Sequence, residues 1–123
     1  MKRVLVADDK ESSREFVKTV LEHEGCVVEE AADGREALEK INANPPQLVV
    51  LDLHMPTLDG FGVLAELRKD PRYSGLPVVA LTASAMQGDR ERALASGFAD
   101  YMTKPIALST LRSRLMQHLQ GLD

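Results

Sequence analysis

The sequence predicts an α/β fold of the (βα)5 type, an open five-stranded parallel sheet with helices on both faces. Five short apolar runs alternate with helical patterns along the chain, as expected of repeated βα units. The central runs are nearly continuous Val, Leu and Ala, which is typical of strands covered on both faces. The length of 123 residues and the hydrophobic content of 44% fit a single domain over residues 1–123.

The strands are expected where the apolar runs occur, because each run has the length of a buried strand. The second run carries Glu29 and Glu30, so we expect it at an edge of the sheet. In chain order the predicted strands are Arg3–Ala7, Val27–Ala31, Leu48–Leu51, Pro77–Leu81 and Tyr101–Thr103.

Apolar residues at helical spacing fill the segments between the strands. The first helix is expected to start near Ser12 or Ser13 and to end before Gly25, and Pro45-Pro46 stops the second. The fourth is short and weakly apolar, and Gly97 closes it. The predicted inward-facing residues are Phe16, Val17, Val20 and Leu21; Ala37, Leu38 and Ile41; Val63, Leu64 and Leu67; Ala93 and Leu94; and Leu108, Leu111, Leu115 and Leu119.

The composition of the chain argues against several classes of function. The net charge is -4, from 15 basic and 19 acidic residues, so we expect no direct contact with nucleic acid. The single cysteine, Cys26, cannot form an internal disulfide and is expected to be a packed residue. The chain has no signal-peptide pattern and no apolar stretch of about 20 residues. These observations predict a cytoplasmic protein that does not insert into membranes.

Polar residues stand where four of the predicted strands end. Asp8-Asp9 follow the first strand, Asp52 the third, Thr82 the fourth and Lys104 the fifth. The carboxyl ends of parallel strands share one edge of a sheet, and ligands bind at that edge. The sequence therefore predicts a shallow cleft with three carboxylates, one hydroxyl and one ammonium. Such a set can hold a divalent cation and pass a phosphoryl group onto a carboxylate.

Each acidic residue has a second interpretation. Adjacent acids such as Asp8 and Asp9 repel each other, and a bound Mg²⁺ would offset that repulsion. Alternatively, Asp9 or a nearby serine caps the first helix. Asp52 is either a further metal ligand or a nucleophile that forms an acyl phosphate. Asp59-Gly60 is interpreted as a turn and the start of the third helix.

The remaining cleft residues are also ambiguous when taken singly. Thr82 is a good strand former, and its hydroxyl could also bond a phosphoryl oxygen. Lys104 is expected to act electrostatically on the acidic cluster, and the isomer of the Lys104-Pro105 bond is left open. His54 has no cysteine or second histidine near it in sequence, so we do not expect a zinc site there.

Over essentially its whole length the chain resembles a response-regulator receiver domain, the CheY-like family of two-component signalling. Four stretches carry the resemblance, in the right order and on the right elements. They are VLVADD (Val4–Asp9), LVVLDLHMPTLDG (Leu48–Gly60), VVALTAS (Val78–Ser84) and GFADYMTKPI (Gly97–Ile106). The resemblance implies the flavodoxin-like strand order 2-1-3-4-5.

The resemblance also implies a role for each site residue. Asp52 accepts the phosphoryl group, while Asp9, Asp52 and the backbone carbonyl of His54 bind Mg²⁺ or Mn²⁺, with Asp8 assisting through water. Thr82 moves toward the phosphoryl group and Lys104 pairs with it. Tyr101 matches the switch aromatic, which turns inward when Thr82 moves, and it is also expected to pack as a strand aromatic on the last helix.

The family implies partners and an output. The phosphoryl group comes from a phosphohistidine on a sensor histidine kinase or a histidine phosphotransfer protein. Phosphorylation shifts the surface of the fourth helix, fifth strand and fifth helix, which then controls a downstream effector protein. The domain is a signalling switch rather than an enzyme, with self-phosphorylation and slow autodephosphorylation only. We expect a monomer or a weak phosphorylation-dependent dimer, whose phosphoryl lifetime is tuned by His54, Ala83 and Ser84.

Other functions compete with this one. A haloacid-dehalogenase-type phosphatase also uses an Asp nucleophile, but it needs an acid where this chain has His54. A flavodoxin-type FMN carrier would place phosphate beside Asp8-Asp9, which repel it in the absence of metal. The chain could also be a receiver excised from a hybrid histidine kinase or a larger regulator. A receiver that signals without phosphorylation is the last alternative.

Overall fold

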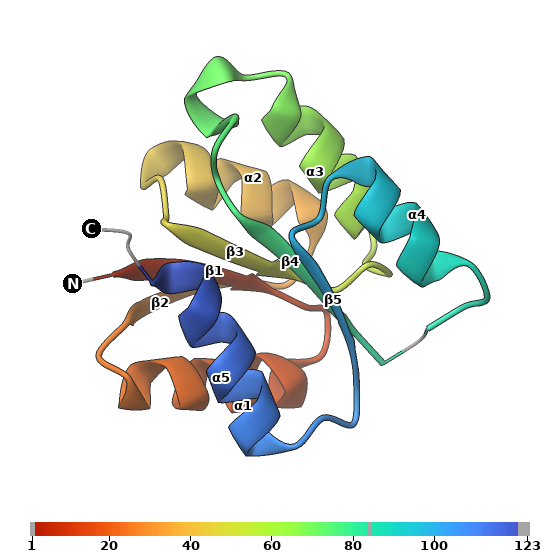
Figure 1. Cartoon of the computed structure of the whole chain (residues 1–123). Coiled ribbons are helices and arrows are strands. Elements are labelled where there is room, and N and C mark those ends of the chain that lie inside the picture. Colours follow the sequence, from red (N-terminus) through yellow and green to blue (C-terminus); the bar gives the residue numbers. More distant parts are fainter. Residues whose placement is uncertain (1, 84, 121–123) are drawn as a thin grey trace.

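The predicted α/β architecture is confirmed by a computed structural model, which describes residues 2–83 and 85–120 (Figure 1). Five parallel strands form one sheet in the order β2-β1-β3-β4-β5. The strands are β1 (Arg3–Ala7), β2 (Val27–Ala31), β3 (Leu48–Leu51), β4 (Val78–Thr82) and β5 (Asp100–Thr103). β2 lies at an edge of the sheet, as its two glutamates predicted.

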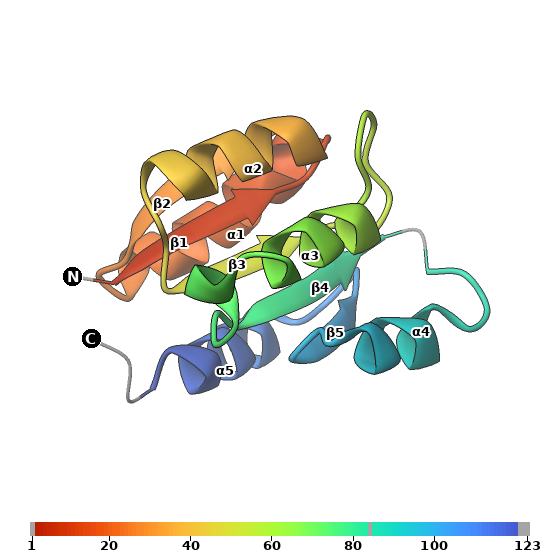
Figure 2. The same cartoon turned by 90° about the horizontal axis from the view of Figure 1, so that it is seen from above.

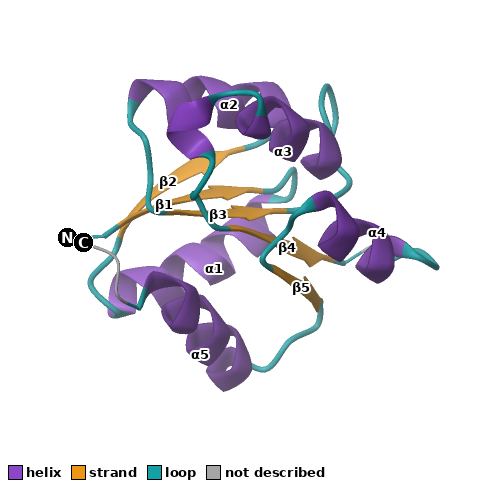
Figure 3. Cartoon of the chain, turned by 45° about the horizontal axis from the view of Figure 1, so that its top comes forward, coloured by secondary structure: helices purple, strands orange, loops and turns teal. Residues whose placement is uncertain are grey.

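Helices cover both faces of the sheet, so the molecule has three layers (Figures 2 and 3). α1 and α5 lie on one face, and α2, α3 and α4 lie on the other. The helices are α1 (Glu11–His23), α2 (Gly34–Ala43), α3 (Gly60–Arg68), α4 (Asp89–Ser96) and α5 (Leu108–Leu119), and a short 3-10 helix η1 (Pro71–Tyr73) follows α3.

The sheet separates two hydrophobic clusters. Along β1, Leu5 and Ala7 pack with α2 and α3, whereas Val4 and Val6 pack with α1 and α5. Successive side chains of a strand point to opposite faces, so both alternate sets of the central strands must be apolar. This requirement explains the continuous Val and Leu runs of the sequence.

Strand bounds differ slightly from those predicted. β4 begins at Val78 and ends at Thr82, one residue later than expected at each end. Pro77 has no backbone N–H with which to join the ladder, although its carbonyl accepts from Val49 at 3.1 Å. β5 begins at Asp100 rather than Tyr101. Thr82 therefore belongs to the strand, which fixes its backbone at the edge of the site.

Three predicted core residues are exposed instead. Phe16, Leu94 and Leu108 keep 39%, 42% and 56% of their surface accessible. Each lies at the margin of an apolar stripe whose other members are buried, as Val17 is in α1 and Leu111 is in α5. Spacing alone defines a stripe wider than the strip of helix that touches the sheet.

The start of α1 also differs from the prediction. The residue before the helix is Lys10, and among the residues that the structure describes no side chain caps the first turn. Asp9, Ser12 and Ser13 therefore do not cap this helix. The Asp8 carboxylate accepts the Lys10 N–H at 2.9 Å instead. The capping alternative for Asp9 is wrong, so Asp9 remains available to a ligand.

The β3–α3 loop lies close to the start of α2. A Cβ added to Gly34 would lie 2.0 Å from the Leu58 carbonyl oxygen, so the loop backbone passes directly over this glycine. Thr57 holds a left-handed conformation with φ 65°, which is uncommon for a β-branched residue. Asp59 accepts the Gly62 N–H at 2.8 Å and caps α3, which confirms the interpretation of Asp59-Gly60 as a helix start.

Candidate functional site

Three carboxylates meet at the carboxyl edge of the sheet. Oxygens of Asp8, Asp9 and Asp52 all lie within 4.8 Å of one another. Asp8 and Asp52 are buried, whereas Asp9 is exposed. The strand-end positions in the sequence predicted this cluster, because β1 and β3 are adjacent and their register places Ala7 beside Leu51.

The loop after β1 is fixed by hydrogen bonds on both sides. The Asp8 N–H donates to the Ala31 carbonyl at 3.1 Å, and the Arg14 guanidinium donates to the Asp8 carbonyl at 2.8 Å. Arg14 also forms an ion pair with Glu30 at 3.2 Å. The sequence analysis did not identify Arg14, which holds the Asp8-Asp9 loop in place from the first turn of α1.

Asp52 is buried beside the other acids. Its N–H donates to the Ala7 carbonyl at 3.0 Å, and one carboxylate oxygen accepts the His54 N–H at 3.0 Å. Burial, with a contribution from the Asp8 charge, raises the pKa of Asp52, while bonds from the His54 amide and the Thr82 hydroxyl oppose the rise. A buried carboxylate with a raised pKa is an energetically costly group of the kind found at functional sites.

Lys104 reaches into the acidic cluster. Its ammonium lies 2.5 Å from the second oxygen of Asp8, and both side chains are largely buried. The Lys104 N–H donates to the Thr82 carbonyl at 2.9 Å, which ties the loop after β5 to the end of β4. The Lys104-Pro105 peptide bond is cis. Lys104 therefore lies beside the acidic cluster, as its position after the fifth strand predicted.

The remaining predicted residues lie around this cluster. Thr82 is fully buried at the end of β4. Tyr101 is buried in the cluster that includes α4, so the expected packing on α5 is wrong: its side chain points to the other face of the sheet. Burial raises the pKa of Tyr101, and the negative charge of Asp89 adds to the rise. Ala83 is exposed next to Thr82. Ser84 lies outside the described residues.

His54 has a partner that the sequence analysis missed. Its Nε2 lies 3.1 Å from a carboxylate oxygen of Asp89, the first residue of α4. The two residues are separated by 35 positions, and no motif links them. An acid in the first turn of a helix is ordinarily explained by the helix dipole, so the sequence held no signal of this contact.

The acidic cluster fits a hard divalent cation. Mg²⁺ prefers carboxylate and carbonyl oxygens and keeps several of its waters. Asp8, Asp9 and Asp52 offer carboxylate oxygens at spacings within 4.8 Å, and the exposed Asp9 leaves one side open to solvent. The donor set contains neither sulfur nor imidazole nitrogen, so it is of the type that suits Mg²⁺ or Mn²⁺.

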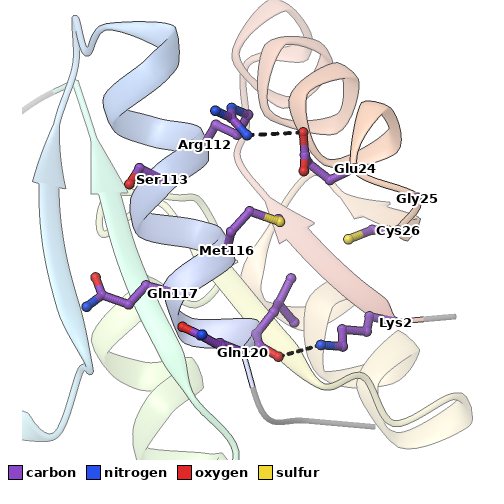
Figure 4. A pocket seen from close by; sticks show the side chains of 10 residues that line it. Lys2, Glu24, Gly25, Cys26, Arg112, Ser113, Met116, Gln117 and Gln120 are labelled. Atoms are coloured by element: carbon purple, nitrogen blue, oxygen red, sulfur yellow. Dashed lines mark hydrogen bonds and ion pairs between the residues drawn. The ribbon is translucent and has the colours of Figure 1, made fainter.

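A cavity of about 980 Å³ lies at the opposite edge of the sheet, between the ends of α1 and α5 (Figure 4). Arg112 and Glu24 face each other across it at 3.5 Å, and Lys2 donates to the Leu119 carbonyl at 2.7 Å. It holds one carboxylate and no cluster of acids among its lining residues. The acidic residues of the strand ends therefore lie away from this cavity.

Among residues 2–83 and 85–120, no helix combines the length and the apolar character needed to cross a bilayer.

Comparison with known families identifies the family of the chain. A model of the response regulator receiver domain matches residues 4–116, a span that includes the acids, Thr82 and Lys104. The chain belongs to the response-regulator receiver family. Receivers are signalling domains of two-component systems rather than conventional enzymes, so the family assignment decides against the phosphatase and flavin-carrier alternatives. It also implies a histidine kinase upstream of the receiver and an effector downstream of it.

Known proteins resemble this receiver over its full length. The receiver domain of the Francisella response regulator 1452 superposes with a TM-score of 0.88 at 36% identity, covering 100% of both chains. Vibrio cholerae CheY4 gives a TM-score of 0.88 at 33% identity over 97% of this chain and 99% of that one. The probable transcriptional regulator ycf27 of Porphyridium aerugineum is 43% identical over 121 residues.

The match to ycf27 covers 98% of this chain but 49% of the regulator. The chain thus spans about half the length of the ycf27 regulators that it matches.

Proposed function

We propose that residues 1–123 act as one phosphoacceptor unit, in which Asp52 receives a phosphoryl group from a partner phosphohistidine. One observation carries this proposal: oxygens of Asp8, Asp9 and Asp52 lie within 4.8 Å of one another, with Lys104 at 2.5 Å from Asp8. A phosphoryl group carries charge on its oxygens during transfer, and catalysis of the transfer is mainly positioning and charge stabilisation. The site supplies both a carboxylate nucleophile and a fixed ammonium.

Asp9, Asp52 and the backbone carbonyl of His54 would hold the divalent cation, with Asp8 assisting through water. When bound, Mg²⁺ or Mn²⁺ neutralises negative charge on the phosphoryl oxygens. The protein's part is to keep the acids in place. Arg14 holds the Asp8 backbone at 2.8 Å, and the Ala7 carbonyl holds the Asp52 backbone at 3.0 Å.

In the transfer step an Asp52 oxygen forms a new bond to phosphorus while the P–N bond of the donor histidine breaks. The electron pair of that bond leaves with the imidazole, which takes up a proton. The product is an acyl phosphate on Asp52. Burial that raises the pKa of Asp52 also leaves this carboxylate poorly solvated, so it has little hydration to lose on attack.

The phosphoryl group adds about two negative charges and strong acceptor oxygens to the site. Lys104 would exchange part of its contact with Asp8 for the new group, and the Thr82 hydroxyl would donate to it. The β4 end and the loop after β5 are already joined by the bond from Lys104 N–H to the Thr82 carbonyl. Tyr101 would follow Thr82, and the surface of α4, β5 and α5 would change for the effector.

Phosphoryl transfer is tested with acetyl phosphate as the donor. The protein is incubated with acetyl phosphate and Mg²⁺, and intact mass spectrometry reads the added phosphoryl group. Borohydride reduction of the acyl phosphate, followed by peptide mapping, is expected to mark Asp52. A label on Asp8 or Asp9 would overturn the assignment. A protein that acetyl phosphate leaves unmodified would count against Asp52 as the acceptor and favour the receiver that signals without phosphorylation.

Removal of the Asp9 carboxylate is expected to weaken binding of Mg²⁺. Asp9→Ala deletes an exposed ligand and leaves the buried pair in place, so the dissociation constant should rise about tenfold, or ~1.4 kcal/mol. Calorimetric titration of Mg²⁺ measures the change. Glu11→Gln is the matched control, because Glu11 is a nearby exposed acid on α1. If both variants lost the same affinity for Mg²⁺, Asp9 would contribute only through its negative charge and not as a ligand.

A further inference from the structure

Helix α4 is held by few contacts. Of its eight residues, all of which the structure describes, only Asp89 and Ala93 are buried. Gly88 and Gly97 flank the helix in left-handed conformations, with φ 86° and φ 109°. A short helix between two such glycines has little apolar surface to fix its position, so its few polar contacts decide where it lies.

Asp89 makes the polar contacts at the start of α4. One carboxylate oxygen accepts the Met86 N–H at 2.8 Å and lies 3.1 Å from Nε2 of His54. A carboxylate only accepts, so the imidazole must donate through Nε2–H. Burial raises the pKa of Asp89, but the Met86 amide and the His54 ring outweigh it and leave the pKa below its ordinary value. Asp89 is therefore a charged, buried acceptor.

The same histidine touches the phosphoacceptor. The His54 N–H donates to a carboxylate oxygen of Asp52 at 3.0 Å. His54 thus links the two sites: its backbone N–H donates to the Asp52 carboxylate, and its ring contacts Asp89, which also accepts the Met86 N–H. The two sites are the group that receives phosphate and the first turn of α4.

A second contact holds α4 without touching the acceptor. The Arg92 guanidinium lies over the Phe61 ring at 3.8 Å, and Phe61 packs edge-on against Phe98 with ring centroids 5.8 Å apart. This cation–π contact fastens the helix to α3. It would keep α4 packed if the His54 contact were lost, so the two attachments can be separated by mutation.

We propose that Asp89 is a positioning residue that acts through His54 and holds α4 in the arrangement of the unphosphorylated receiver. The inference rests on the proposed function of Asp52. In this proposal the contact is broken in the phosphorylated arrangement, so it opposes the change to that arrangement. By linkage, breaking the contact makes binding of a phosphoryl group or its mimic more favourable.

A double-mutant cycle with beryllofluoride and Mg²⁺ tests this coupling. Asp89→Ser removes the acceptor for His54 and keeps a hydroxyl at the start of the helix, and the affinity for beryllofluoride should rise about fivefold. His54→Ala removes the ring, retains the backbone donor to Asp52, and should have a similar effect. Adding Asp89→Ser to His54→Ala should then change little, because the contact is already absent.

A spectroscopic readout separates positioning from a general loss of stability. The amide signals of α4 in ligand-free Asp89→Ser should move along the line that joins the free and beryllofluoride-bound positions of the unmutated protein. Glu91→Gln removes the same charge from an exposed position of the same turn and should leave both the signals and the affinity unchanged.

Additive effects in the cycle, or equal behaviour of Asp89→Ser and Glu91→Gln, would overturn the role of Asp89 while leaving Asp52 as the acceptor. If the unmutated protein itself fails to bind beryllofluoride, the proposed function fails, and this inference fails with it. Should Asp89→Ser not fold, His54→Ala compared with Glu91→Gln carries the same expectation, because this pair leaves the Met86 contact of Asp89 intact.

Discussion

Asp52→Asn is expected to abolish phosphorylation by acetyl phosphate and the response to beryllofluoride. Asparagine has nearly the shape of aspartate, so it can keep the bond from the His54 N–H. An amide oxygen is a much weaker nucleophile than a carboxylate, and without the negative charge it is also a weaker ligand for a divalent cation. Amide spectra recorded with and without beryllofluoride measure the change, and signals near Thr82 and Lys104 should no longer move.

The same substitution is expected to raise the thermal stability of the metal-free protein at neutral pH. Burial raises the pKa of Asp52 in the folded state. A group with a raised folded pKa contributes stability below its unfolded pKa, and that stability is lost as the pH rises through the folded value. At pH 7 the charged Asp52 therefore costs stability, and asparagine avoids the cost.

Unfolding midpoints measured without metal, at neutral and at mildly acidic pH, test whether the charged Asp52 lowers the stability of the fold. The advantage of Asp52→Asn should shrink as the pH falls and the aspartate of the unmutated protein takes up its proton. Asp70→Asn is the control, because Arg72 and its amide lower the pKa of Asp70 on the surface.

A retained beryllofluoride response in Asp52→Asn would remove Asp52 from its role as acceptor.

Gly34→Ala is expected to destabilise the fold strongly. Alanine is about 1 kcal/mol better than glycine inside a helix, so helix propensity alone predicts a gain. The new Cβ, however, would lie 2.0 Å from the Leu58 carbonyl oxygen and 2.7 Å from its carbon. Overpacking typically costs about 1–3 kcal/mol, and occasionally more. The obstructing atoms are backbone, so we expect a net loss of about 3 kcal/mol or more at the upper end of that range.

Urea denaturation followed by circular dichroism measures this loss. Gly75→Ala is the matched control, since an added Cβ there meets nothing within 4 Å and should change the free energy of unfolding by at most about 0.5 kcal/mol. If both variants were equally stable, the loop that carries Leu58 would have to move aside easily. That result would also mean that the loop after Asp52 is less firmly held than the close approach to Gly34 indicates.

Much of the fold and of the acidic site could be predicted because both depend on patterns along the chain. Five apolar runs, each followed by a helix, define a parallel sheet, and parallel strands bring their ends to one edge. Asp8, Asp52 and Lys104 needed no further information to be placed together. In the structure the Lys104 ammonium forms an ion pair with the Asp8 carboxylate at 2.5 Å. The strand order is the one that the family resemblance implied.

Contacts between separate loops could not be predicted in this way. The contact of His54 with Asp89 and the approach of Leu58 to Gly34 each depend on how two connections lie after the sheet has formed. None of these four residues is unusual within its own segment of the sequence. Likewise, the spacing of Phe16 fits the α1 stripe, and only the packing of that helix on the sheet leaves its ring 39% exposed.

The sparse burial of α4 has a consequence for the divergence of receivers. Because only Asp89 and Ala93 are covered, the exposed positions of the helix other than Arg92, which contacts Phe61, can mutate at little cost to folding. After gene duplication, mutations on this one helix can therefore change which effector protein is recognised. The proposed phosphoacceptor site at the edge of the sheet stays unchanged. Insulation of parallel signalling pathways would then evolve mainly through surface changes on α4 and not through changes in chemistry.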